Sequence, residues 1–157
     1  MANIFQPDFE SFDGLPAPFT RRQARVAAQA GARDVGGTVY ELRSGEAICP
    51  LHFHRANEEM VIVLAGRPTL RTLDGQRELE PGEVVACPVG RAGAHRIDNH
   101  GDEPARVLIV STMRYPEVVD YPDSGKLGAR TAGPGDPSGE RILFRRESAV
   151  DYFDGEL

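Results

Sequence analysis

Short apolar runs, each followed by turn-forming residues, make up most of the chain between positions 23 and 113. The runs are rich in Val, Ile, Leu and Thr, and they are short and closely spaced, which is typical of strands. We expect strands at residues 23–27, 38–42, 48–54, 60–64, 69–73, 76–79, 84–87, 95–98 and 106–113. No helical pattern intervenes, which predicts an all-β, antiparallel sandwich or barrel. Residues 23–30, rich in Ala, Gln and Arg, are also compatible with a helical turn, and both interpretations stay open.

Turn-forming residues mark the ends of these predicted strands. Asp74-Gly75 is the strongest hairpin signal, because both central residues of a type I′ turn need positive φ. Pro81-Gly82, Val89-Gly90 and the segment 99–101 supply further breaks. The hairpins that they predict fit one β domain, which we place at residues 21–118.

The first 20 residues form a segment of their own. Phe5, Phe9, Phe12 and Phe19 lie in it, whereas disordered segments are poor in aromatic residues. We therefore expect residues 1–20 to be an extended arm whose aromatic side chains dock on the domain or on a partner subunit.

Residues 119–157 form a C-terminal extension. Gly and Pro are so frequent between 120 and 140 that we expect a long irregular connection there. The segment 141–157 again contains aromatic residues, so we expect it to pack on the barrel or on a partner. Exchange of the two terminal segments between subunits would produce a homodimer.

Composition narrows the classes of protein and of partner. A chain of 157 residues with 40% hydrophobic content can build one sizeable core. The net charge of −6 gives no sign of a nucleic-acid-binding surface. No apolar run approaches the ~18 residues of a membrane span, and the N-terminus lacks the features of a secretory signal. The sequence therefore predicts a cytoplasmic protein whose two cysteines are reduced thiols and whose partners are small molecules.

Three of the four histidines form a pattern that is typical of a metal site. His52 and His54 lie on one face if their segment is a strand, because side chains alternate along a strand. Glu58 and Glu59 follow closely, and His95 lies downstream. Two imidazoles, a carboxylate and a third imidazole suit a first-row divalent metal and leave coordination positions open.

These residues lie within two motifs that resemble those of the cupin superfamily. The first motif consists of Gly45, His52, His54, Glu59 and Gly66, and the second of Gly82, Pro88, Val89, Gly90, His95 and Asn99. Six residues separate Gly45 from His52 where the family has five, and four separate Gly90 from His95 where the family has two. Both departures fall in loops, so they should leave the ligands on the strands in place.

The resemblance implies a double-stranded β-helix, the jelly-roll barrel of cupins. It also implies one divalent transition metal, Zn, Fe, Mn or Ni, held by His52, His54, Glu59 and His95. Glu59 fits better than Glu58 because it has the family's spacing to Gly66 and shares strand parity with inward-facing valines. The chain is similar to small single-domain cupins that are labelled as sugar-phosphate isomerases or left uncharacterised.

The remaining polar residues near the motifs have simpler interpretations. Asn99 is expected to satisfy backbone groups of the turn after His95, and His100 to be solvated. Cys49 and Cys87 are expected to be small buried hydrophobes rather than ligands, because Cys49 has the opposite strand parity to the two histidines.

Function is predicted only by class. We expect a metal-dependent enzyme that acts on a small polar metabolite by isomerase, lyase or dioxygenase chemistry. No catalytic base can be assigned, although Glu58, Tyr40 and Glu41 lie nearby along the strands. The alternative is a protein that binds a sugar or carboxylate without turnover. Arg67 and Arg71 could recognise such an anion, although exposed hairpin charges are the simpler interpretation.

Overall fold

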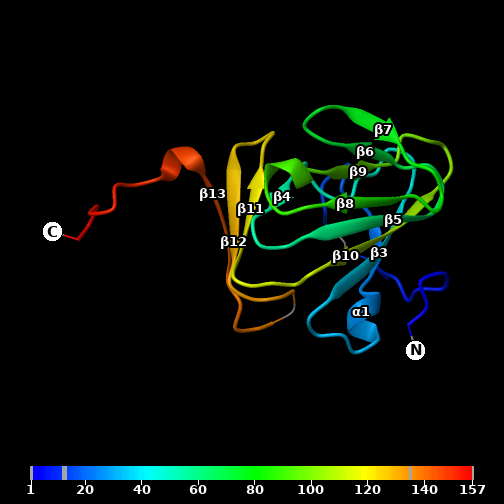
Figure 1. The fold of residues 1–157 in the computed structure, drawn as a ribbon, viewed down its shortest axis with the longest axis horizontal. Coiled ribbons are helices and arrows are strands. Elements are labelled where there is room, and N and C mark those ends of the chain that lie inside the picture. The colour runs from blue at the N-terminus through cyan, green and yellow to red at the C-terminus, as the bar shows by residue number, and fades with distance from the viewer. Residues whose placement is uncertain (1, 12–13, 135, 157) are drawn as a thin grey trace.

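The computed structural model describes residues 2–11, 14–134 and 136–156, and these form three antiparallel sheets (Figure 1). The six-stranded sheet has the order β1 (Glu10–Ser11), β2 (Arg22–Ala24), β3 (Gly36–Leu42), β10 (Ala105–Ser111), β5 (Glu59–Ala65) and β8 (Val84–Cys87). The four-stranded sheet has the order β13 (Arg141–Arg145), β12 (Lys126–Arg130), β11 (Glu117–Tyr121) and β4 (Phe53–His54). The three-stranded sheet consists of β7 (Gln76–Glu78), β6 (Thr69–Arg71) and β9 (Arg96–Asp98). Short helical turns complete the fold at α1 (Val26–Gln29), η1 (Arg91–Gly93) and η2 (Arg146–Ser148).

The main core lies between the six-stranded and the three-stranded sheets. Val61 and Val63 on β5 are buried, and they pair in register with Ile109 and Val107 on β10. Strand alternation explains this, since every second side chain of each strand faces the same side of the sheet. The core is completed by Leu42, Ile48, Leu70, Leu79, Cys87 and Ile97.

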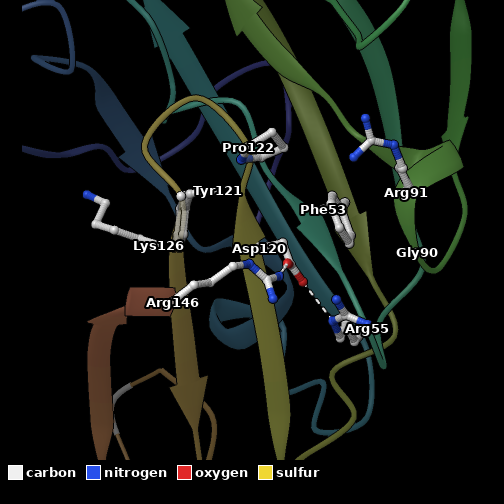
Figure 2. A pocket seen from close by; sticks show the side chains of 10 residues that line it. Phe53, Arg55, Gly90, Arg91, Asp120, Tyr121, Pro122, Lys126 and Arg146 are labelled. Carbon is white, nitrogen blue, oxygen red and sulfur yellow. Dashed lines mark hydrogen bonds and ion pairs between the residues drawn. The ribbon is translucent and has the colours of Figure 1, made fainter. Parts of the chain in front are cut away.

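The four-stranded sheet separates two environments. On β4, the side chain of Phe53 lies on the opposite side from His54, toward Asp120 of the neighbouring strand β11 (Figure 2). His54 itself pairs with Val119 and faces the barrel interior. This alternation places the predicted metal ligands inside and a set of charged residues outside.

Most predicted strands are confirmed, and the open segment 23–30 contains both alternatives, since β2 is followed directly by α1. The strand predicted at 48–54 is wrong for most of its length. Only Phe53–His54 forms a strand, while Ala47 and His52 make isolated bridges to Asp98 and His95. Proline at position 50 has no N–H group, so it cannot donate to a ladder of hydrogen bonds.

The hairpin predicted at Asp74-Gly75 is confirmed, but its type I′ turn is wrong. The loop spans residues 72–75, where the Thr72 amide donates to the Gly75 carbonyl at 2.8 Å. Of the two central residues of the predicted turn, only Gly75 has positive φ, at 148°. The Thr72 hydroxyl accepts from the Asp74 amide and donates to the Gly75 carbonyl, which stabilises this wider loop.

The irregular connection predicted over 120–140 is wrong for its first half. β11 and β12 form a hairpin whose turn contains Pro122 and Gly125, and Gly125 has a φ of 62°. Gly128 lies within β12, where the Tyr121 ring covers it. The glycines therefore serve one turn and one close contact within regular structure.

The N-terminal arm docks on its own barrel. Phe9 and Ile4 pack against the buried side chains of Ala24, Val26 and Val39, while Phe5 is exposed. Phe19 lines the interior cavity described below, and Phe12 lies outside the described residues. Across the part of the chain that the structure describes, no helix has the length and apolar character needed to cross a membrane.

Candidate metal centre and cavity

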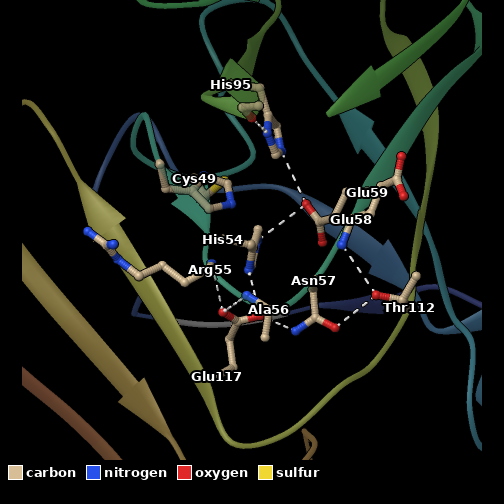
Figure 3. A network of polar contacts seen from close by, with 12 residues as sticks. Cys49, His54, Arg55, Ala56, Asn57, Glu58, Glu59, His95, Thr112 and Glu117 are labelled. Atoms are coloured by element: carbon tan, nitrogen blue, oxygen red, sulfur yellow. Dashed lines mark hydrogen bonds and ion pairs between the residues drawn. The ribbon is translucent and has the colours of Figure 1, made fainter. Parts of the chain in front are cut away.

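The side chains of His52, His54, Glu59 and His95 converge between the six-stranded and four-stranded sheets. Figure 3 shows the last three of them. His52 and His95 face each other through a backbone bridge, in which each amide donates to the other's carbonyl at 3.2 and 2.9 Å. His54 ends β4, and Glu59 begins β5. Three separate segments of the chain therefore supply the group.

The distances between these side chains are short enough for one ion. Ligand atoms of His52, His54 and Glu59 all lie within 4.8 Å of one another. Glu59 Oε2 lies 3.4 Å from His54 Nε2 and 3.2 Å from His95 Nε2. The His52 and His95 rings are 4.6 Å apart between centroids, so His95 borders the compact group of three. Glu58 is exposed and points away from the histidines (Figure 3).

Each histidine has an acceptor beside its Nδ1 atom. Nδ1 of His52 lies 3.0 Å from the Pro50 carbonyl, and Nδ1 of His95 lies 2.9 Å from the Gly93 carbonyl. Nδ1 of His54 lies 3.4 Å from Oε2 of Glu117, close to this acceptor but without a hydrogen bond to a described residue. An acceptor at Nδ1 favours the tautomer that carries its proton there, which leaves the lone pair of Nε2 free.

The free nitrogen atoms provide a test of whether these residues fit a metal. Nε2 of His95 and both ring nitrogens of His54 are buried and form no hydrogen bond with any described residue. Burying a polar atom without a partner is costly. A divalent cation would satisfy both Nε2 lone pairs together with the Glu59 carboxylate. The donor set therefore fits a metal ion.

A buried network holds His54 in place. Glu117 is 2% exposed and accepts hydrogen bonds from the amides of Arg55 and Ala56 at 3.0 and 3.1 Å. The Asn57 side-chain amide donates to the same carboxylate, while its oxygen accepts from the Thr112 hydroxyl. Glu117 thus has a fixed position beside the ring of His54.

Burial and neighbouring charges set the protonation of the group. Burial, reinforced by the nearby His95, lowers the pKa of His52 to about 4, so this imidazole is neutral at pH 7. Burial alone would raise the pKa of Glu59, but its contacts with His54 and His95 outweigh burial and hold that pKa below its ordinary value. Burial would lower the pKa of His95, but its contacts with Cys87 and Glu59 outweigh burial and raise that pKa above its ordinary value. His52 and Glu59 therefore have the forms that bind metals, a neutral imidazole and an ionised carboxylate, whereas metal binding at His95 would displace a proton.

The candidate metal centre opens into a cavity of about 420 Å³, which we call the interior cavity. Its lining holds four cationic side chains, those of Arg21, Lys126, Arg130 and Arg141. None of these four forms an ion pair with a residue that the structure describes. Nε of Arg21 is buried without a hydrogen-bond partner among those residues. In a protein of net charge −6, this group gives the interior cavity a local positive charge.

The cationic residues named from sequence lie elsewhere. Arg67 pairs with Glu78 and Glu80, and Arg71 pairs with Asp123, all at the surface. The simpler interpretation of these two arginines, exposed hairpin charges, is therefore the correct one.

Two of the three proposed bases are also outside the cavity. Glu58 is exposed, and Glu41 pairs with Arg22 and Arg106. Tyr40 does line the cavity, and burial, together with the Cys49 thiol, raises its pKa to about 12.

Strand alternation predicted that Cys49 faces away from His52 and His54, and this prediction is wrong. Its sulfur lies 3.5 Å from Nδ1 of His52 and lines the cavity, because the chain before His52 is not a regular strand. Cys87 belongs to the core, as expected. His100 is exposed, and the Asn99 amide donates to the carbonyls of Leu42 and Glu103, both as expected.

Sequence reasoning missed Glu117, Asn57 and the four cavity cations. Asn57 lies between His54 and Glu59 in the sequence, and its polar character was the one feature that could have marked it as part of the site. Glu117 is more than 60 positions from its partners Arg55 and Ala56, so no spacing rule could have found it.

Known proteins share this fold and these motifs. Residues 35–111 match the family model of the cupin domain. Residues 35–111 of the chain therefore form a cupin domain, with the double-stranded β-helix fold that the two motifs predicted. No curated protein sequence matches it.

Solved structures extend the likeness beyond the barrel. A protein described as "Putative sugar phosphate isomerase" from Acidithiobacillus ferrooxidans is 28% identical, with a TM-score of 0.77 over 88% of this chain and 84% of its own. A cupin described as a sugar phosphate isomerase from Silicibacter pomeroyi is 24% identical, with a TM-score of 0.79 over 98% of both chains. The polyketide cyclase RemF from Streptomyces resistomycificus is 23% identical, with a TM-score of 0.60 over 74% of this chain and 82% of its own. The last two show likeness of fold alone.

Proposed function

We propose that the protein is a divalent-metal-dependent enzyme that acts on a small anionic metabolite in the interior cavity. The metal ligands are His52, His54, Glu59 and His95, and the ion is Zn, Fe, Mn or Ni, all of which accept a mixed imidazole and carboxylate set. The observation that carries the proposal is the group of unpaired cations beside the four ligands. An anionic molecule held by these cations lies next to the metal centre.

The metal, when bound, would supply a Lewis acid that polarises an oxygen atom of the ligand. Arg21, Arg130 and Arg141 bind and orient an anionic group, because a guanidinium matches phosphate and carboxylate geometry. Tyr40 stays protonated at neutral pH and donates a hydrogen bond to the bound molecule. Glu59 is the one carboxylate that lines the described wall of this cavity.

The substrate class follows from this lining. A sugar phosphate combines an anionic group with hydroxyl and carbonyl oxygens, and the similar protein from Acidithiobacillus ferrooxidans carries the name of a sugar phosphate isomerase. Sugar phosphates are therefore the first ligands to test, with isomerase, lyase and dioxygenase chemistry as the reaction types. A protein that binds such an anion without turnover is the alternative.

The test combines metal content with ligand binding. Elemental analysis of the purified protein should find one divalent metal per chain, and His95→Ala should reduce it, whereas the exposed His100→Ala should not. Titration with sugar phosphates and with the corresponding free sugars should show binding of the phosphorylated forms alone. A wild-type protein that takes up no metal when metal is supplied would refute the proposal. Binding without turnover would establish the alternative.

We also propose that the cupin barrel of residues 21–118, with the N-terminal arm 1–20 and the extension 119–157, assembles as a homodimer. Support comes from the extension, in which every described residue from 141 to 156 is exposed. Light scattering should find a particle of twice the 17.1 kDa chain mass.

A further inference from the structure

A second cavity lies on the opposite face of β4 from the metal centre (Figure 2). It encloses about 530 Å³, and we call it the back cavity. Phe53 and Arg55 line it because they alternate with His52 and His54 along the chain. Tyr121 and Lys126 line both the back cavity and the interior cavity, so the two cavities share a wall.

The back cavity carries excess positive charge. Its lining contains four cationic side chains and one carboxylate, a formal charge of +3: Arg55, Arg91, Lys126, Arg146 and Asp120. Arg55 Nε donates to Asp120 at 2.7 Å, and Arg146 contacts the other oxygen of the same buried carboxylate. Arg91 and Lys126 have no ion-pair partner within the described chain. Apolar faces of Phe53, Tyr121 and Pro122 lie beside these charges.

Residues 147–156, which we call the C-terminal tail, carry the opposite charge to the back cavity. The tail contains four acidic residues and no Lys or Arg, a formal charge of −4: Glu147, Asp151, Asp154 and Glu156. Its apolar side chains Val150, Tyr152 and Phe153 are 71%, 87% and 61% exposed. Leaving such a group of large apolar side chains in water is unfavourable, and it marks a surface that another molecule covers.

The tail follows directly after a residue that lines the back cavity. Arg146 lines the cavity and immediately precedes the tail, which then leads away from the body of the protein (Figure 1). Ten extended residues can span about 33 Å. A two-fold axis close to Arg146 would therefore bring the tail of each copy to the back cavity of the other, and such reciprocal contacts are the usual form of a dimer interface.

We propose that the back cavity binds an acidic, aromatic peptide segment, and that its occupant is the C-terminal tail of a second copy. The carboxylates meet Arg91 and Lys126, and Tyr152 or Phe153 packs against Phe53 and Pro122. This inference rests on the homodimer proposed above and names the surfaces that form it. Because Tyr121 and Lys126 also line the interior cavity, the docked tail supports one wall of the metal site.

Charge reversal on the full chain tests the exchange. Arg91→Glu lowers the formal charge of the back cavity from +3 to +1 and puts a carboxylate opposite the carboxylates of the tail. The double variant Asp151→Arg/Asp154→Arg raises the formal charge of the tail from −4 to 0 and puts guanidinium groups opposite Arg91. Each variant alone should weaken dimerisation by about tenfold or more, because like charges are juxtaposed at both contacts. Mixing the two variants should restore a heterodimer, since the introduced glutamate then faces the introduced arginines, and the unchanged cavity faces an unchanged acidic tail. Arg33→Glu, a reversal at an exposed arginine outside the back cavity, is the control and should leave the dimer intact.

Each result distinguishes between possible occupants of the back cavity. Circular dichroism and metal content check that every variant is folded. A wild-type dimer that neither reversal weakens refutes the tail contact and leaves the homodimer standing. Weakening without rescue in the mixture refutes exchange. A monomeric wild type refutes both, and if that monomer binds inorganic phosphate and Arg91→Glu does not, the occupant is a small anion.

Discussion

The carboxylate of Glu117 is predicted to determine how tightly the metal binds, although it does not contact the metal itself. Its Oε2 atom lies 3.4 Å from Nδ1 of His54 and holds that ring with its Nε2 atom toward Glu59. Glu117→Gln keeps the size of the side chain but removes the charge that favours a proton on Nδ1. Loss of such an outer carboxylate costs about 10- to 100-fold in metal affinity, which is about 1.4–2.7 kcal/mol.

The same substitution should also lower stability without metal. The Glu117 carboxylate accepts from two backbone amides and from Asn57. A glutamine places an NH₂ group where one of these donors points, and one unsatisfied buried donor costs about 1–3 kcal/mol. Urea unfolding of the metal-free protein measures this loss separately from affinity.

Competition with a fluorescent zinc chelator measures the affinity. Glu59→Gln, which removes a ligand, should lose more than Glu117→Gln, and the exposed Glu58→Gln should match the wild type. A folded Glu117→Gln protein with wild-type affinity would show that the contact between Glu117 and His54 does not orient the ring.

Two further predictions concern the barrel. Gly66→Ala should lower the free energy of unfolding by about 1–3 kcal/mol more than Gly45→Ala does, as measured by urea unfolding. Both glycines have positive φ, but only at Gly66 would an added Cβ meet backbone, 2.6 Å from the Pro104 carbonyl oxygen. Equal losses in the two variants would contradict this. Leu42→Ala should cost about 2–5 kcal/mol, since Leu42 is fully buried in the main core; a loss below about 1 kcal/mol in thermal or urea unfolding would show that the site collapses around the smaller side chain.

Local patterns predicted the parts of the structure that depend on neighbours in sequence. The strands around Val61 and Val107 follow from apolar runs bounded by turns, and the hairpin at Gly75 follows from turn chemistry. The same reasoning was wrong where a tertiary contact set the backbone. Residues 47–52 follow bridges to His95 and Asp98 rather than a strand, and the glycine-rich segment after residue 120 forms a hairpin.

The sequence predicted the antiparallel β class, the cupin domain through its two motifs, and the histidine and glutamate residues to consider as ligands. These features depend on the spacing of residues along the chain. Strand alternation determines which face of a sheet a side chain lies on, and turn-forming residues determine where the chain reverses direction. The folded structure was needed to show that Glu117 lies beside His54. It was also needed to show that the cations of the interior cavity are Arg21, Lys126, Arg130 and Arg141. It alone also showed that the back cavity shares a wall with the metal site. These groups come from segments far apart in sequence, and charge and burial act through space rather than along the chain.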